Sequence, residues 1–204
     1  SRPARHAALR RLAQALGFTP NQTMRRIFVD TEWTAVPWSG DCELLWIGLA
    51  DEDGRELCGI NSDARVDPAN ERYVAALLDL ATPDLPRLRR TELMSAVRSF
   101  CEGVDEFWAW IPTLESFAAW SKLGSSAPAA YERCRQIDFQ MLHALVRPWP
   151  DDWPNEVRDL NAASLAAGAS LPPRAKNHLH PRVHAQWNRS LFSNIIAAGH
   201  GRDA

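Results

Sequence analysis

The alternation of apolar and polar positions divides this chain into short strands and amphipathic helices. Residues 27–32 form an apolar run that ends in two carboxylates. Residues 43–50 and 55–60 form two further apolar runs around an Asp-Gly turn, which is typical of an antiparallel hairpin. A continuous apolar run at 106–111 predicts a buried parallel strand. Together these runs predict a mixed sheet that opens with a three-strand meander.

Helical spacing of apolar residues separates these strands. The pattern predicts helices at residues 4–16, 70–80, 91–101, 115–123, 131–146, 159–167 and 181–198. Gly17, Gly124 and Gly168 follow three of these segments, and Pro181 suits a first helical position. We expect an α/β fold in which helices flank the mixed sheet. Residues 1–25 are expected to form a helical extension, and residues 26–204 the main domain.

Composition narrows the class of protein. The 204 residues are 46% hydrophobic and 24% charged, as in an ordinary globular protein. A net charge of −2 excludes a global basic field for nucleic acid, so any binding groove would need local arginines. Four widely spaced cysteines favour reduced thiols in the cytoplasm over a zinc ribbon or a disulfide scaffold. No apolar stretch reaches the ~18 residues of a membrane span, so we expect no membrane partner.

The two carboxylates of the first strand are the strongest chemical signal. Asp30 and Glu32 are two residues apart, so a strand points both to one face. Two neighbouring anions are costly unless a cation joins them, and Mg²⁺ or Mn²⁺ prefers such oxygen ligands. The alternative is a strand that runs into a solvated acidic turn. Trp33 follows the pair and could stack on a base or belong to the core.

Four landmarks occur in a fixed order along the chain. They are the Asp30-Thr31-Glu32 triplet with the strand after it, the segment from Glu106 to Phe117, Trp153-Pro154 with Arg158-Asp159-Leu160, and the segment from His180 to Asn188. In this order they resemble the DEDD superfamily of 3′–5′ exonucleases, and within it a small bacterial 3′–5′ exoribonuclease group. The resemblance covers roughly residues 26–196 and implies a ribonuclease H-like fold.

The resemblance also implies a two-metal site. It places Asp30, Glu32, Glu115 and His184 at the four metal-binding positions, although the family has Asp where this chain has Glu115 and His184. The family's catalytic His falls on Leu179, with His178 and His180 on either side. We take His180 as the predicted general base and His178 as its alternative. Trp33 would meet the 3′-terminal nucleotide.

Each altered position has two readings. Glu115 keeps the carboxylate but adds one methylene, and it could equally be a first-turn acid that favours the helix dipole. His184 replaces an oxyanion by imidazole, which shifts the expected metal preference from Mg²⁺ toward Mn²⁺ or Co²⁺. It could also be a histidine on an ordinary helix face.

These observations support three functional hypotheses. The first is a metal-dependent 3′–5′ exonuclease with weakened activity, in particular an exoribonuclease that releases nucleotides from single-stranded RNA or DNA 3′ ends. The second is a catalytically inert nuclease-like domain that binds nucleic acid or protein. The third is a structural interaction module. The chain begins with Ser, so we expect it to be part of a longer polypeptide; the sequence also allows a homodimer.

Overall fold

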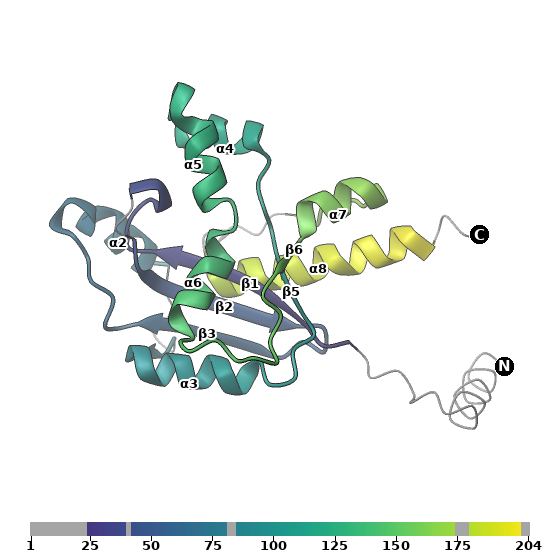
Figure 1. Ribbon diagram of the computed structural model, residues 1–204, viewed down its shortest axis with the longest axis horizontal. Coiled ribbons are helices and arrows are strands. Elements are labelled where there is room, and N and C mark those ends of the chain that lie inside the picture. Colours follow the sequence, from purple (N-terminus) through teal and green to yellow (C-terminus); the bar gives the residue numbers. More distant parts are fainter. Residues whose placement is uncertain (1–23, 40–41, 81–84, 174–179, 201–204) are drawn as a thin grey trace.

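The chain forms a six-stranded mixed sheet with helices on both faces (Figure 1). The computed structural model describes residues 24–39, 42–80, 85–173 and 180–200. The strands are β1 (Arg26–Trp33), β2 (Leu44–Asp51), β3 (Glu56–Asn61), β4 (Arg87–Leu88), β5 (Glu106–Ala109) and β6 (Val157–Asp159). Their order across the sheet is β4-β3-β2-β1-β5-β6.

The predicted meander and the predicted parallel strand are both confirmed. β1 pairs antiparallel with β2, and β2 pairs antiparallel with β3. β5 lies next to β1 and runs parallel to it, with Ile27 opposite Phe107. β4 and β6 extend the two edges in parallel. The sequence did not predict these two strands, because runs of two and three residues are too short to show a period.

The described helices agree with the predicted positions, apart from one division. They are α2 (Glu71–Leu78), α3 (Arg90–Phe100), α4 (Leu114–Ser121), α5 (Ala127–Cys134), α6 (Ile137–Leu145), α7 (Leu160–Ala167) and α8 (Pro181–His200). Short 3₁₀ turns occur at Pro37–Ser39, Pro68–Asn70 and Gly124–Ser126.

The prediction of one helix over residues 131–146 was wrong. The segment is broken at Gln136, whose φ of −111° and ψ of 32° are not helical. The break lets the two halves pack on different partners. Phe139 and Leu142 of α6 join the core against the sheet, whereas Ala130 and Cys134 of α5 join a separate cluster with α4.

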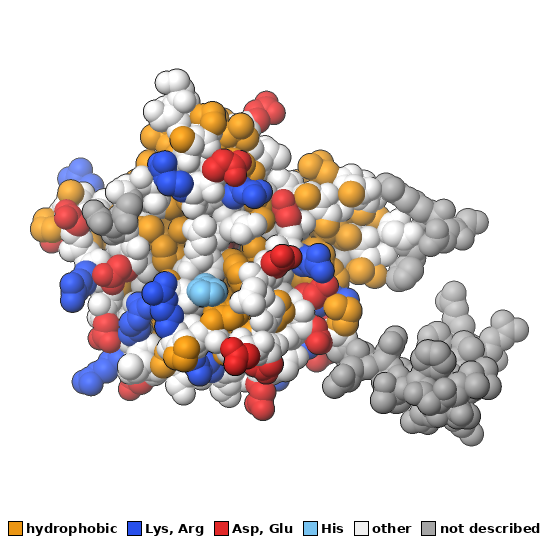
Figure 2. Space-filling view, in the orientation of Figure 1, with side chains coloured by type: hydrophobic (Ala, Val, Ile, Leu, Met, Phe, Trp, Pro, Cys, Tyr) orange, Lys and Arg blue, Asp and Glu red, His pale blue; other side chains and the backbone are white. Residues whose placement is uncertain are grey.

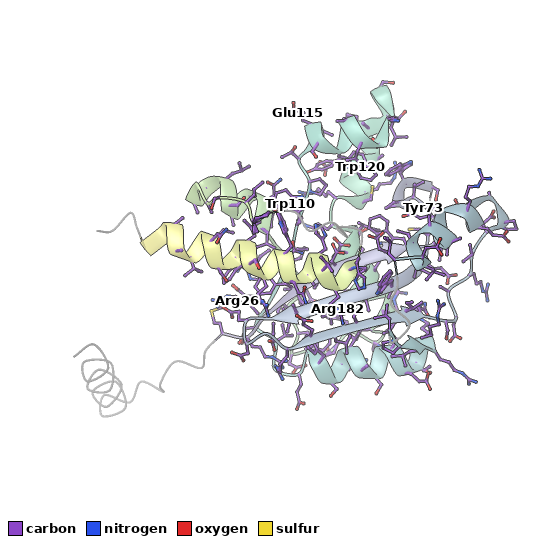
Figure 3. All side chains as sticks on the ribbon, turned by 180° about the vertical axis from the view of Figure 1, so that it is seen from behind. Arg26, Tyr73, Trp110, Glu115, Trp120 and Arg182 are labelled. Carbon is purple, nitrogen blue, oxygen red and sulfur yellow. The ribbon has the colours of Figure 1, made fainter. Side chains whose placement is uncertain are left out.

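Each face of the sheet has its own helical layer. Ile27 and Val29 of β1 face α3 and α6. Phe28, between them in sequence, faces α8 and packs with Trp187 and Leu191. α8 crosses behind the sheet in Figure 1 and in front of it in Figure 3. The alternation of side chains along β1 therefore sends one set to each layer.

α8 lies directly on the backbone of β2. A Cβ at Gly48 would stand 2.3 Å from the carbonyl carbon of Pro181 and 2.5 Å from the amide nitrogen of Arg182. Only glycine permits this approach, because the obstructing atoms are backbone and cannot rotate away. The contact fixes the start of α8 relative to the centre of the sheet.

The second half of β1 extends beyond its parallel neighbour. β5 pairs with Arg26–Phe28 only, so the following residues have no strand partner on that side. Two side chains bond the backbone there. Asn188 Nδ2 of α8 donates to the carbonyl of Val29 at 3.2 Å, and the amide of Thr31 donates to Asp138 Oδ1 of α6 at 2.9 Å. Buried backbone groups need such partners.

The predicted extension at residues 1–25 falls almost entirely outside the described residues. Arg25, at its end, packs on the domain, since its guanidinium donates to the carbonyls of Phe100 and Glu102. Within the described part of the chain, no helix has the length and apolar character needed to cross a membrane.

Candidate active site

A cavity of about 430 Å³ lies where β1 runs past β5. Its floor is the end of β1, and its walls come from α2, α4, the junction of α5 and α6, and α8. Three carboxylates line it, namely Asp30, Glu32 and Asp138. Six aromatic residues also line it, namely Trp33, Tyr73, Trp110, Phe117, Trp120 and Trp187. Acidic groups and flat apolar rings therefore share one space.

Asp30 and Glu32 lie together at the floor, as their spacing predicts. Only 6% of Asp30 and 8% of Glu32 is exposed, which excludes the alternative of a solvated acidic turn. Burial raises the pKa of Glu32 well above its usual value, and the charges of Asp30 and Asp138 raise it further. A cation between these groups would remove that penalty.

His184 of α8 is bonded to the floor. Its Nδ1 lies within hydrogen-bond contact of Asp30 Oδ1. The imidazole also stacks on the indole of Trp187, with ring centroids 5.6 Å apart and an angle of 22° between the planes. The structure thus brings together three of the predicted site residues, Asp30, Glu32 and His184.

Asp138 is a third carboxylate that the sequence did not single out. Its Oδ1 accepts from the amide of Thr31 at 2.9 Å and from the Thr31 hydroxyl at 2.7 Å. Burial and the charge of Asp30 raise the pKa of Asp138 to about 7, although the bonds from Thr31 act in the opposite direction. Asp138 falls in the middle of the helix predicted at 131–146, where a single acid is unremarkable, so no sequence signal singled it out.

Glu115 is not brought to the pocket. It is exposed, and it lies on the outer side of α4, away from β1 (Figure 3). The next two residues, Ser116 and Phe117, line the pocket instead. Thr113 caps α4 by accepting from the Ser116 amide at 3.1 Å. In this position Glu115 matches the alternative reading, an acid in the first turn of a helix.

His180 precedes α8, packs against Trp46 of β2 and does not line the pocket. Only 3% of it is exposed, and its ring meets the edge of Trp46 with centroids 4.4 Å apart. Burial lowers its pKa, followed by the charge of Arg182. Because His180 is buried and does not line the pocket, it is not placed to act there as a general base. His178, the alternative, is outside the described residues.

Trp33 lines the pocket, but its indole is also bonded to the strand. Nε1 donates to the Thr31 hydroxyl at 2.8 Å, and the ring packs on the main core. The structure adds Trp110 and Trp187, which meet edge to face with centroids 5.3 Å apart. The chain contains nine tryptophans, and this high count is the sequence signal that could have pointed to further rings in the pocket.

The predicted four-residue metal set is not assembled. Across the described ranges, no group of three or more His, Cys, Asp or Glu side chains is placed to hold a metal ion. The donor chemistry at the floor nevertheless suits a hard cation, because Asp30 and Glu32 offer buried carboxylate oxygens. Mg²⁺ commonly uses one or two protein carboxylates together with water and substrate phosphates. The residues therefore fit a cation shared with substrate, not a closed protein cage.

Sequence comparison finds no protein family whose profile matches this chain and no curated protein with detectable similarity to it. A function for this chain therefore has to be inferred from the geometry and chemistry of the pocket.

Proposed function

We propose that this chain is a metal-dependent 3′–5′ exonuclease domain of the ribonuclease H-like fold that acts on single-stranded 3′ ends. The observation that carries the proposal is the buried Asp30–Glu32 pair at the floor of an aromatic pocket. The order β3-β2-β1-β5-β6, with β2 antiparallel to its neighbours, is compatible with that fold. In open α/β sheets, ligands bind beyond the carboxyl ends of the strands, which is where this pocket lies.

The size and lining of the pocket suit a nucleotide. A cavity of about 430 Å³ is within the range of ~300–1,000 Å³ for small-molecule sites and leaves room for one nucleotide. The rings of Trp110 and Trp187 offer apolar contacts to a base. The carboxylates would repel a phosphate unless a cation lies between them. Mg²⁺ or Mn²⁺ would supply that bridge and lower the pKa of a bound water.

The protein side chains would bind the cation, position β1 and supply the general base. Asp30 and Glu32 would hold the cation. Asp138 keeps the end of β1 in place through its bonds to Thr31. His184 replaces His180 as our assignment for the base, because it lines the pocket and the contact of Nδ1 with Asp30 orients its ring.

A second function is favoured by two specific observations. His184 is paired with Asp30, and Glu115 lies away from the pocket. Both reduce the number of ligands that the protein offers a cation. An inert nuclease-like domain that binds nucleic acid in the same pocket is the alternative.

Release of mononucleotides from a 3′-labelled oligonucleotide tests the two functions. RNA and DNA substrates are each assayed with Mg²⁺, Mn²⁺ and Co²⁺. We expect Asp30→Asn to lower the rate by at least ~100-fold, because displaced or missing groups at a reacting centre cost about that much. Asp53→Asn is the matched control, since Asp53 is exposed in the β2–β3 turn. Activity that survives Asp30→Asn would refute the proposed site; binding without release under any metal would support the inert domain.

A further inference from the structure

A second aromatic surface stands at the mouth of the pocket, on α4. Trp120 lines the pocket, yet 48% of it is exposed. Two rings hold its indole: Trp38, at a centroid distance of 5.0 Å, and Phe117, at 5.3 Å and nearly perpendicular. Figure 3 shows Trp120 on the side of α4 that faces the body of the protein, opposite to Glu115. The ring is therefore fixed and half open at the same time.

Such a ring is costly for the free protein. A large aromatic side chain contributes stability mainly through burial, and about half of that gain is lost at Trp120. Figure 2 shows hydrophobic side chains exposed over the projecting α4 and α5. Leu114 on the same helix is also exposed, at 41%, but it does not line the pocket. The position of Trp120, rather than its exposure alone, points to a ligand.

Arg135 supplies a positive charge to the lining of the same pocket. It lies at the junction of α5 and α6, and among the described residues that line the pocket it is the only Lys or Arg. Its side chain is exposed, and Nε is 3.5 Å from Glu132 Oε2, which is exposed as well. Exposed ion pairs contribute little, so a phosphate could readily displace Glu132. Arg135 also offsets the negative field of the three carboxylates.

We propose that Trp120 and Arg135 form a second nucleotide subsite, outside the floor of the pocket. The base of the nucleotide that precedes the 3′ end stacks on Trp120, and a phosphate of the strand contacts Arg135. The inference rests on the proposed function only in that a nucleotide occupies the floor. A 3′-terminal nucleotide on the floor would lie against β1, and the nucleotide before it would then lie toward the opening, where Trp120 lines the pocket and is half exposed.

This subsite defines a substrate class. Stacking on an indole tolerates every base, because each base has a π-face. A base that is paired in a duplex cannot leave its neighbours without an unstacking cost of a few kcal/mol. The subsite therefore selects strands with at least two unpaired nucleotides at the end, with little preference for their sequence.

Binding of short ligands to the full chain tests the proposal. Uridine monophosphate, a dinucleotide and a tetranucleotide, as RNA and as DNA, are titrated with Ca²⁺ present to limit cleavage. We expect Trp120→Ala to weaken the binding of the two oligonucleotides by ~5–150-fold, the equivalent of ~1–3 kcal/mol of stacking. Uridine monophosphate should bind as before, because it occupies the floor. Trp120→Phe should retain most of the affinity, since phenylalanine also stacks.

Arg135→Gln tests the phosphate contact separately. It should weaken the dinucleotide and lower the slope of log K against log salt by about one, the value for one lost phosphate contact. Leu114→Ala is the matched control on α4 and should leave the affinities for uridine monophosphate and for the dinucleotide unchanged. Hydrogen exchange of α4 and α5 in each variant shows whether the helices still fold.

Several results would overturn the subsite. The first is that Trp120→Ala leaves dinucleotide affinity unchanged. The second is that it weakens uridine monophosphate and dinucleotide binding equally. The third is that Trp120→Phe weakens dinucleotide binding as much as Trp120→Ala does. Absence of binding to every ligand by the native chain would overturn it too. Native binding without nucleotide release leaves the subsite supported while the exonuclease proposal fails, so the two failures are distinguishable.

Discussion

The floor and the outer wall of the pocket are built in different ways. The floor is the end of β1, where Asp30 and Glu32 are buried and neighbouring side chains bond the backbone from both layers. The outer wall is α4 and α5, which project from the sheet in Figure 1 and share a small cluster around Phe117. A buried charged group at the floor needs a hydrogen-bond partner or a counter-charge, whereas an exposed group on the wall is solvated by water. Asp30 and Glu32 belong to the floor, whereas Glu115 belongs to the wall and points away from the pocket.

Replacing one buried phenylalanine in the sheet core and one in the α4–α5 wall should give the largest difference in stability between the two regions. Phe107 of β5 is fully buried in the main core that supports the floor, and Phe117 of α4 is 2% exposed. We expect Phe107→Ala to lower the free energy of unfolding by ~3–5 kcal/mol, measured by urea denaturation. Phe117→Ala should instead accelerate hydrogen exchange of α4 and α5 by roughly 100-fold, with a much smaller change in the urea midpoint. Equal global losses from both would show that the two regions unfold as one.

The backbone contact under the floor gives the next largest effect. Gly48→Ala would place a Cβ 2.3 Å from the Pro181 carbonyl carbon. Because backbone cannot yield there, we expect a loss of about 3 kcal/mol and a shift of α8 away from Asp30. Gly199→Ala, in the same helix with open space around it, is the control and should be neutral or stabilising by up to ~1 kcal/mol. A neutral Gly48→Ala would mean that α8 does not rest on β2.

A smaller effect should appear as a pH dependence of the free energy of unfolding, caused by the carboxylates of the floor. The pKa of Asp138 is raised from 3.8 to about 7 by burial and by Asp30, so the folded state binds its proton more tightly than the unfolded state. Unfolding free energy without divalent cations should therefore fall as pH rises from about 4 to about 7. Asp138→Asn, followed by urea denaturation across this range in EDTA, should flatten the decline. A native stability that rises over this range would contradict the assignment.

The smallest effect should come from the wall. Glu115 is exposed and outside the pocket, so Glu115→Gln should change nucleotide release by no more than ~2-fold, as for a surface substitution away from special features. Glu32→Gln, assayed beside it, should cause a large loss. A large loss from Glu115→Gln would show that α4 turns inward when substrate binds, which would restore the ligand set expected from the sequence.

The sequence predicted the sheet better than the site, for physical reasons. Alternation and apolar runs predicted β1, β2, β3 and β5 with boundaries within about two residues, because these strands are long enough to show a period. The position of Asp30 and Glu32 on one face followed from strand geometry alone. Within the site, the outcome for Glu115 depends on how α4 leaves the sheet, and no local pattern encodes that exit.

Asp138 and Trp120 were missed for related reasons. Asp138 reaches Thr31 only because the helix breaks at Gln136, and no glycine or proline marks that break. Trp120 was one of nine tryptophans, and its helical spacing is the same as that of a core residue. Long-range packing decides which of them becomes a pocket wall. Local sequence patterns do not contain that information.

The unpaired stretch of β1 has a further consequence, for association between chains. A strand edge with free amide and carbonyl groups is a template for another strand, and native proteins block such edges. Here the blocking groups are Asn188 and Asp138, which bond Val29 and Thr31 from α8 and α6. Asp138, which lines the pocket, and Asn188, which is buried behind it, thereby also guard against edge-to-edge aggregation. Loss of either helix contact would leave backbone groups of β1 free to pair with a strand of a second copy.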